Sequence, residues 1–312
     1  IAFAATRLVP NSRVESARRH FDIPGAVSVT AGLVVLVYAI VQAADWGWGS
    51  PSTLGLMAVA IALIGAFVWI ERRSPAPLVR LGLLRLRSLA VSNGVFLIVV
   101  GGLFAMFFFA SLYLQKVLGY SPLTTGLAFL PVTAGIMIGA TAAQQMISRV
   151  GVRPVMLTGM TVAAAGLGVL AATTEVGGSY LGVLGGLLPM AIGMGATFVP
   201  ITLVATTNVD ANEAGLASGI FNTSQQIGGA LGLAILSTLA NDRTASFLAG
   251  LGGAASPAEQ QQGLVEGFQL AFVVAAAMIA VGAVLIAVLL RRRDVERIES
   301  GDEPAEAVPV AA

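Results

Sequence analysis

Eight long apolar stretches divide this 312-residue chain, and its positive charges fall almost entirely in every second segment between them. About 20 apolar residues are enough to cross the hydrocarbon core of a bilayer. The stretches are Ile23–Gln42, Leu54–Ile70, Leu89–Leu114, Leu123–Ile147, Val155–Thr173, Leu181–Thr206, Gly215–Leu239 and Leu270–Leu290. The chain is therefore predicted to be an all-α, polytopic transmembrane helical bundle.

The distribution of Lys and Arg predicts which ends of these spans face the cytoplasm. Of the 17 basic residues, only Lys116 and Arg243 lie outside the segments that precede the first span or follow the second, fourth and eighth spans. Segments rich in Lys and Arg stay on the cytoplasmic side of a membrane. The protein is thus expected to be a multi-pass cell-membrane protein with a cytoplasmic C-terminus and outer loops near residues 43–53, 115–122, 174–180 and 240–269.

The composition excludes several other classes of protein. Hydrophobic residues make up 56% of the chain and charged residues 11%, whereas about a quarter of the residues of a soluble domain are charged. The sequence contains no Cys and a single His, His20, so neither a thiolate nor a His-based metal site is expected, and no cofactor. An integral membrane enzyme would need acids, His or Cys clustered near one leaflet. That pattern is missing from the sequence, and the chain is not predicted to be an enzyme.

The spans and the segments between them predict five parts. These are the end of a preceding transmembrane helix with a cytoplasmic loop (1–22), two extra transmembrane helices (23–73), an amphipathic cytoplasmic connector (74–88), a six-helix bundle (89–290) and a disordered cytoplasmic tail (291–312). The chain begins with Ile1 rather than Met and has no basic region before its first apolar residues. It is therefore expected to be a piece of a longer protein.

Helix boundaries and bends are also marked in the sequence. Ser256-Pro257-Ala258-Glu259 has the spacing of a capping box and predicts a short surface helix, to Glu266, within the outer loop 240–269. Asp210-Ala211-Asn212-Glu213 has the same spacing at the start of the seventh span. Prolines inside the fourth and sixth spans, Pro131, Pro189 and Pro200, each remove a backbone hydrogen bond and are expected to bend their helices.

Uncharged polar residues inside the spans are the main candidates for function. The seventh span is the richest, with Asn222-Thr223-Ser224-Gln225-Gln226, and Asn222 shares a helical face with Gln225 or Gln226. Buried amides in lipid need partners, so they face protein or water. Interhelical hydrogen bonding and the lining of a cavity are both open. The pairs Gly135/Gly139, Gly215/Gly219 and Gly228/Gly232 have the G-x-x-x-G spacing of closely packed helices.

Acidic residues are expected only in loops, span ends and the tail. An ionisable residue inside a membrane usually marks an ion pathway, so a proton-coupling carboxylate is not expected in the middle of any span. Asp22 and Asp45 flank the first span at opposite surfaces. Helix capping, a solvated helix end and coupling are the alternatives for these two residues.

One segment closely resembles a stretch of the 14-helix drug:proton antiporters of the major facilitator superfamily. It is Tyr113-Leu114-Gln115-x-x-x-Gly119-Tyr120-Ser121-Pro122-x-x-x-Gly126-x-x-x-Leu130-Pro131. Other pieces resemble the same family in order: Arg19-His20-Phe21-Asp22-Ile23-Pro24-Gly25, Trp48, Pro77-Leu78 through Arg85-x-Arg87, Gly215-Leu216-Ala217-Ser218-Gly219, Asn222-Thr223-Ser224 and Gly228-Gly229-Ala230-Leu231-Gly232.

The resemblance implies that the eight spans are helices 7–14, the C-terminal portion of such an antiporter in a bacterial plasma membrane. The first two spans would be the extra pair, and the last six the C-terminal bundle. In this superfamily the first, second, fourth and fifth helices of each bundle line the central cavity. Projected onto this chain, the cavity-lining candidates are Asn93, Gln144, Thr197, Asn222, Gln225 and Gln226.

Two departures from the family pattern are visible. The inner segment Arg149, Gly151 and Arg153 resembles the superfamily's gating loop, but Ser148 stands where an acid is usual. The alternative role of the two arginines is only to fix the topology. Gln225 stands where many relatives carry Arg, which removes a cation from the implied cavity.

The expected function is part of a secondary active transporter for proton-coupled export of drugs or other hydrophobic or amphiphilic small molecules by alternating access. The implied partners are the hydrophobic substrate, protons, the lipid bilayer and an N-terminal six-helix bundle of the same chain; no nucleic acid is expected. An uptake or metabolite carrier of the same fold and a non-transporting membrane scaffold are the alternatives. Multidrug efflux and antibiotic resistance are the biological roles that the resemblance implies.

Overall fold

The computed structural model describes residues 22–74, 87–206 and 214–290, and within these ranges it contains only helices and the turns between them. The amphipathic connector, the capping box at Asp210 and the C-terminal tail lie outside the described residues. Seven helical stretches are long and apolar enough to cross a membrane, judged by length and composition. The remaining long helix, α9, falls outside this group because the polar run from Asn222 to Gln226 lowers its mean hydropathy.

The first two described helices form an antiparallel hairpin. α2 (Ile23–Trp46) begins where the side chain of Asp22 accepts a hydrogen bond of 2.9 Å from the backbone N–H of Gly25. α3 (Pro51–Arg73) begins at the cap Ser50, with Pro51 at its first position, where a proline is favoured. Gly32 of α2 lies close to the side chains of Leu63 and Ile64 of α3, which lets the two helices approach. Asp22 thus serves as a helix cap.

The third and fourth spans each contain an irregularity. α4 (Arg87–Leu112) ends in a π-helical turn, η2 (Tyr113–Val117). The fourth span is broken at Phe129 into α5 (Pro122–Ala128) and α6 (Leu130–Val150). Pro131 lies in the first turn of α6, two residues after this break. The interruption of the fourth span next to Pro131 agrees with the disturbance expected of a proline within a helix.

The next two helices pack closely against each other in the bundle. α7 (Val152–Thr173) is followed by α8 (Tyr180–Thr206), which contains Pro189 and Pro200 in its interior as expected. The turn between them is held from two sides. The hydroxyl of Tyr113 donates to the Glu175 carbonyl at 2.8 Å, and Nε2 of Gln269 donates to the Thr174 carbonyl at 2.7 Å.

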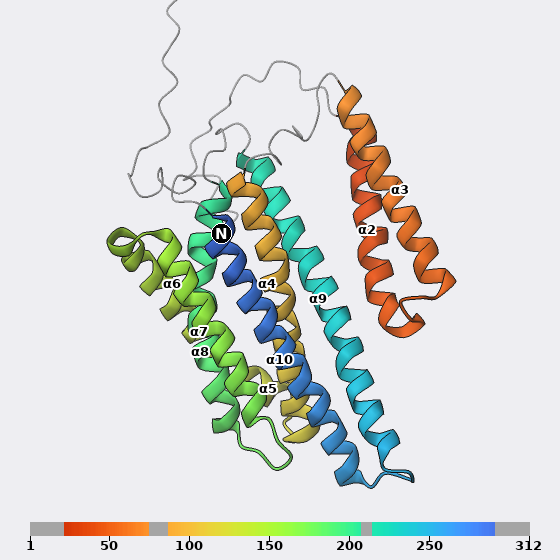
Figure 1. Ribbon diagram of the computed structural model, residues 1–312, viewed down its shortest axis with the longest axis vertical. Helices are drawn as coiled ribbons and strands as arrows, with labels where there is room; N and C mark the ends of the chain where they lie inside the picture. The colour runs from red at the N-terminus through yellow and green to blue at the C-terminus, as the bar shows by residue number, and fades with distance from the viewer. Residues whose placement is uncertain (1–21, 75–86, 207–213, 291–312) are drawn as a thin grey trace, which may run out of the picture.

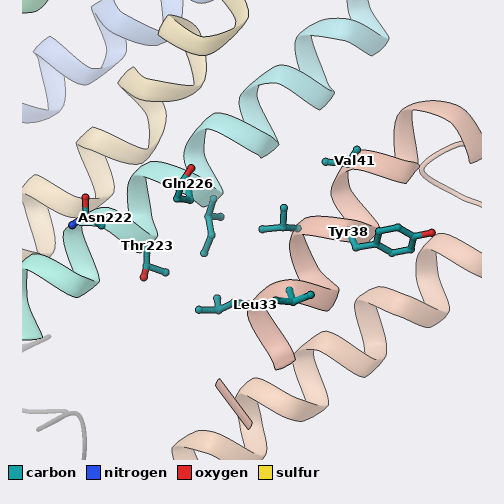
Figure 2. A pocket seen from close by; sticks show the side chains of 9 residues that line it. Leu33, Tyr38, Val41, Asn222, Thr223 and Gln226 are labelled. Atoms are coloured by element: carbon teal, nitrogen blue, oxygen red, sulfur yellow. The ribbon is translucent and has the colours of Figure 1, made fainter. Parts of the chain in front are cut away.

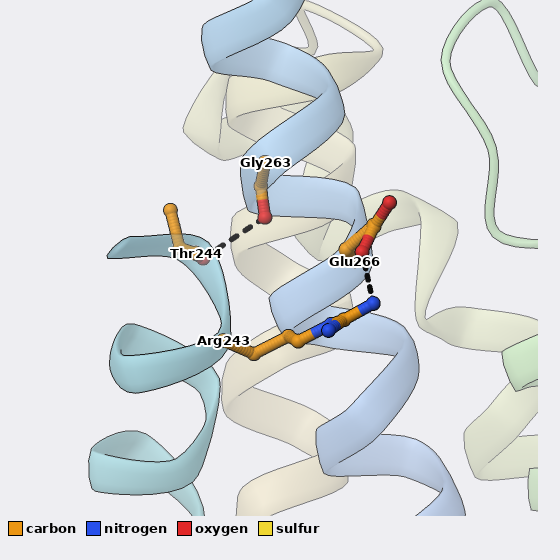
Figure 3. A network of polar contacts seen from close by, with 4 residues as sticks. All are labelled: Arg243, Thr244, Gly263 and Glu266. Carbon is orange, nitrogen blue, oxygen red and sulfur yellow. Dashed lines mark hydrogen bonds and ion pairs between the residues drawn. The ribbon is translucent and has the colours of Figure 1, made fainter. Parts of the chain in front are cut away.

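The last two helices are longer than the sequence predicted. α9 (Ala214–Gly250) and α10 (Pro257–Leu289) run almost to a short turn, so the long outer loop 240–269 with its separate surface helix was wrong. The capping box at Ser256 and Glu259 is present, but it opens α10 itself. Polar contacts join the two extensions: Arg243 pairs with Glu266 at 2.6 Å, and Thr244 donates to the Gly263 carbonyl at 2.9 Å (Figure 3). These contacts satisfy polar groups of both helices in a stretch that was predicted to be a loop because of its low hydropathy.

Helices α4 to α10 pack into one bundle, and the α2–α3 hairpin lies against its α9 side (Figure 1). Close approaches of backbone are made at glycines. A side chain at Gly139 of α6 would overlap the Ile192 carbonyl of α8, and one at Gly232 of α9 would overlap Gly101 of α4. The packing expected for Gly135/Gly139 and Gly228/Gly232 is therefore present. Gly215 and Gly219 instead face open space.

The Lys and Arg residues of the described ranges are divided unequally between the two ends of the bundle. Arg72 and Arg73 end α3, and Arg149 and Arg153 flank the α6–α7 junction, at one end of the bundle in Figure 1. Lys116 in η2 and Arg243 near the end of α9 lie toward the other end. This arrangement is the one that strict alternation of the spans requires.

Candidate functional site

A groove between α2 and α9 is the candidate site. We call it the α2–α9 groove and define it by its lining: Leu33, Val34, Val37, Tyr38 and Val41 from α2, and Asn222, Thr223, Gln226 and Ile227 from α9. Its volume is about 560 Å³, within the range of about 300–1,000 Å³ typical of small-molecule sites. In Figure 2 the amide of Asn222 lies on the side of α9 away from α2, and the ring of Tyr38 is directed away from α9.

The polar wall of the groove is exposed although it belongs to a predicted membrane span. Asn222 and Gln226 are both exposed, four residues apart on one face of α9. They lie about 12 and 18 Å along the helix from its first residue, at 1.5 Å per residue. Amides at such depth cannot be left facing hydrocarbon, where an unsatisfied polar group costs several kcal/mol. If the predicted seventh span lies in the bilayer, this face of α9 is expected to meet a polar partner.

The side chain of Asn93 is hydrogen-bonded to residues within the bundle. Its side-chain nitrogen donates to the Leu89 carbonyl of α4 at 2.8 Å, and its oxygen accepts from the Ser224 hydroxyl of α9 at 2.9 Å. Asn93 is 8% exposed. Beside it, Phe96 stacks on Phe221 with ring centroids 4.2 Å apart. Asn93 and Ser224 thus form an interhelical hydrogen bond between α4 and α9.

The other predicted cavity residues do not gather at the groove. Gln144 is exposed on α6, and Gln225 is half-buried on α9 but does not line the groove. Thr197 is fully buried, donates to the Gly193 carbonyl at 2.8 Å and lies beside Gly159 of α7. Of the six candidates, the structure brings only Asn222 and Gln226 together at the groove.

The predicted gating segment lies at the junction of α6 and α7. Gly151 has φ of +87°, a conformation that favours glycine, and it ends one helix and begins the next. Arg149 is exposed, whereas Arg153 is half-buried and donates from its guanidinium to the Ala287 carbonyl in the last turn of α10. A cation at a helix C-terminus also interacts favourably with the helix dipole. Arg153 therefore joins α7 to α10.

The contribution of α2 to the groove was not predicted from the sequence. Five of its residues line the groove, and the indole N–H of Trp48, just after α2, donates to the Thr238 hydroxyl of α9 at 3.1 Å. The sequence contained one signal, the helical spacing of Val34, Tyr38 and Val41. The structure shows that these three side chains are exposed. Apolar spacing alone does not distinguish a groove wall from a lipid-facing surface.

Comparison with known proteins agrees with this helical membrane architecture. The sequence profile of the Major Facilitator Superfamily matches residues 5–233. The chain is 36% identical to the puromycin resistance protein pur8 of Streptomyces alboniger over 98% of its own length. It is 33% identical to the tetracenomycin C resistance and export protein of Streptomyces glaucescens over 76% of its length, and 32% identical to the cephamycin export protein CmcT of Amycolatopsis lactamdurans over 83%.

The helical bundle, the membrane-length apolar helices and the matched profile define a class of membrane protein. The chain belongs to the Major Facilitator Superfamily. It spans 60% of the length of the puromycin resistance protein, 44% of the tetracenomycin C protein and 52% of the cephamycin protein.

Proposed function

We propose that this chain is part of a secondary active transporter that exports hydrophobic or amphiphilic small molecules. Its relatives include proteins named for resistance to puromycin and for export of tetracenomycin C and cephamycin. The α2–α9 groove is the observation on this chain that carries the proposal. It combines a drug-sized volume and an apolar lining with two exposed amides inside the span predicted from the sequence.

The proposal includes proton exchange and alternating access. The acidic residues of the described helices lie near helix ends or in the extensions of α9 and α10: Asp45, Glu71, Asp242, Glu259 and Glu266. A coupling carboxylate at mid-membrane is therefore proposed to lie in a second six-helix bundle of the same protein. In this arrangement the chain supplies one side of the substrate path.

The proposed orientation follows from the separated charges. The end of the bundle with Arg72, Arg73, Arg149 and Arg153 would face the cytoplasm of a bacterial cell, as would the C-terminus. Export then requires that the groove accept substrate from the cytoplasm or the inner leaflet.

Transport by the complete gene product tests the proposal. The protein is reconstituted in vesicles, a proton gradient is imposed, and movement of puromycin and of the uncharged dye Nile red is followed. Gradient-driven movement of at least one compound is expected, and N222L and Q226L should change the relative rates for the two. Q144L is the matched control, because Gln144 is exposed on α6 away from the groove. Failure to move either compound, or any other amphiphile of a wider panel, would contradict the proposal.

A further inference from the structure

We propose that Tyr113, Tyr180 and Gln269 act together as a clasp that holds the α7–α8 turn and the end of α5 in one arrangement. We call these three residues the turn clasp. The α7–α8 turn and α5 lie at the end of the bundle opposite the α6–α7 junction (Figure 1). The inference does not depend on export. It gives a structural role to the segment from Tyr113 to Pro131, which the proposed function leaves unused.

The hydroxyl of Tyr113 makes two hydrogen bonds with Glu175 of the α7–α8 turn. It donates to the Glu175 carbonyl at 2.8 Å and accepts from the Glu175 N–H at 3.3 Å. Tyr113 is 1% exposed. Gly178 of the same turn lies so close that a Cβ there would be 2.5 Å from the hydroxyl oxygen. Tyr113 is therefore enclosed by the turn and satisfies both backbone groups of Glu175.

Gln269 of α10 binds the neighbouring residue of the turn. Its Nε2 donates to the Thr174 carbonyl at 2.7 Å. Thr174 ends α7 and is fully buried. Carbonyls at a helix C-terminus have no partner within the helix, and a buried carbonyl that lacks a partner costs free energy. Residues at the end of α4 and in α10 thus hold consecutive residues of one turn.

Tyr180 connects the same turn to the interrupted fourth span. Tyr180 is the first residue of α8, and its hydroxyl donates at 2.7 Å to the carbonyl of Ala128, the last residue of α5. A helix end leaves carbonyls that need a partner from elsewhere. The Tyr180 hydroxyl supplies one at the break beside Phe129. The α7–α8 turn is therefore tied to α5 as well as to α4 and α10.

The π-helical turn η2 shapes the end of α4 around the first member of the clasp. The turn begins at Tyr113 and is closed by a bond of 3.1 Å from the Leu118 N–H to the Tyr113 carbonyl. Gly119 follows with φ of +72°, and the Tyr120 N–H returns to the Leu114 carbonyl at 2.9 Å. π-helical turns are rare and occur frequently at functional sites. This irregular end turns the chain toward α5 directly after Tyr113 has entered the α7–α8 turn.

The three contacts are expected to act as one unit because they meet on one short turn. Tyr113 and Gln269 bind adjacent residues, and Tyr180 is where the turn passes into α8. Loss of one contact gives more freedom to the backbone that the other two hold, so that hydrogen bonds in such a network support one another. The ends of α4, α5, α7, α8 and α10 at this side of the bundle are thus expected to move together.

Hydrogen exchange at a single amide tests the inference. The complete gene product is placed in nanodiscs without any gradient, and exchange of the Glu175 N–H is followed by mass spectrometry with fragmentation. Y113F removes the acceptor of this N–H and should accelerate its exchange about tenfold or more. Q269M and Y180F leave that acceptor in place, yet each should accelerate the same amide about threefold or more, because the contacts support one another.

Two matched controls remove similar groups outside the clasp. Y120F keeps the ring beside Tyr180, with centroids 6.4 Å apart, and removes a hydroxyl that makes no hydrogen bond within the described residues. Q262M makes the same substitution as Q269M on α10, at a side chain that likewise has no hydrogen bond within the part of the chain that the structure describes. Both variants should leave exchange at Glu175 unchanged.

Three outcomes would overturn the inference. Acceleration in Y113F alone would show that the three bonds are independent. Unchanged exchange in Y113F would show that its hydroxyl does not protect the turn, and acceleration in the controls equal to that in Q269M and Y180F would indicate general loosening of the bundle. None of these results bears on export, because exchange is measured without a gradient. Failure to move any amphiphile would in turn contradict export and leave the turn clasp standing.

Discussion

At the scale of single residues, similar polar side chains have different environments. Asn93 and Asn222 are both asparagines inside apolar spans, yet Asn93 is hydrogen-bonded to α9 through Ser224 while Asn222 is exposed beside α2. The difference follows from helix rotation, because α4 turns Asn93 toward a neighbouring hydroxyl. The bonded amide therefore has a packing role, whereas a binding role is proposed only for the exposed one.

Arg153 offers a test of whether the α6–α7 junction has a structural role. R153Q removes the charge-assisted bond to the Ala287 carbonyl and should lower the free energy of unfolding by about 1.5–3 kcal/mol. R149Q is the control, because Arg149 is exposed on the preceding helix and should change stability by less than about 0.5 kcal/mol. Thermal unfolding in detergent, followed by circular dichroism, measures both. Equal effects of the two substitutions would mean that the positive charge matters and the contact does not.

At the scale of the helices, glycine sets how closely the bundle packs. Gly193 and Gly186 of α8 meet the backbone of α7, and Gly195 of the same helix meets α6. Without a hydrophobic driving force between helices in lipid, this close packing is a main source of association. These glycines matter because each one faces the backbone of a particular neighbouring helix.

A pair of glycine substitutions tests this contribution. G139A places a methyl group against the Ile192 carbonyl of α8, and relief of this overlap should cost about 1–3 kcal/mol. G168A is the matched control within α7, where a side chain meets nothing within 4 Å. Alanine there should be neutral or stabilising by up to about 1 kcal/mol, because it favours the helix more than glycine. If thermal unfolding shows equal losses for both, the α6–α8 contact is not limiting.

At the scale of the whole molecule, the two ends of the bundle differ in charge. The described arginines at the α3 end and the α6–α7 junction lie opposite Lys116 and Arg243. The turns after α2, α7 and α9 share the end with few positive charges. This separation is what sets the orientation of a helical protein during insertion.

Single cysteines in this cysteine-free chain test the orientation. S50C, S179C and G252C lie in the turns after α2, α7 and α9 and should react with an impermeant maleimide in intact cells. S148C is exposed at the opposite end of the bundle and should react only after the cells are opened. Reaction of S148C in intact cells, with protection of the other three, would reverse the proposed orientation.

The sequence predicted the existence of the helices better than their ends. The capping box at Ser256 was correctly recognised, but the helix that it opens runs through to Leu289 instead of stopping at Glu266. The error arose because hydropathy marks the part of a helix that lipid surrounds and not its extension into water. In the candidate site, Asn222 and Gln226 were among six predicted cavity residues, whereas the wall from α2 was not predicted. Apolar residues such as Val37 carry no sign in the sequence of which helix they will face.

Two properties could be predicted from the sequence alone: the chain forms apolar helices, and the segments that connect them alternate in charge. Both properties depend on segments of about 20 residues and on the cost of placing charge in lipid. They can therefore be predicted from the order of residues alone. Only the tertiary structure decided which polar groups are satisfied by neighbours and which remain exposed. That outcome depends on how each helix is rotated and on which helix packs beside it, as the bonded Asn93 and the exposed Asn222 show.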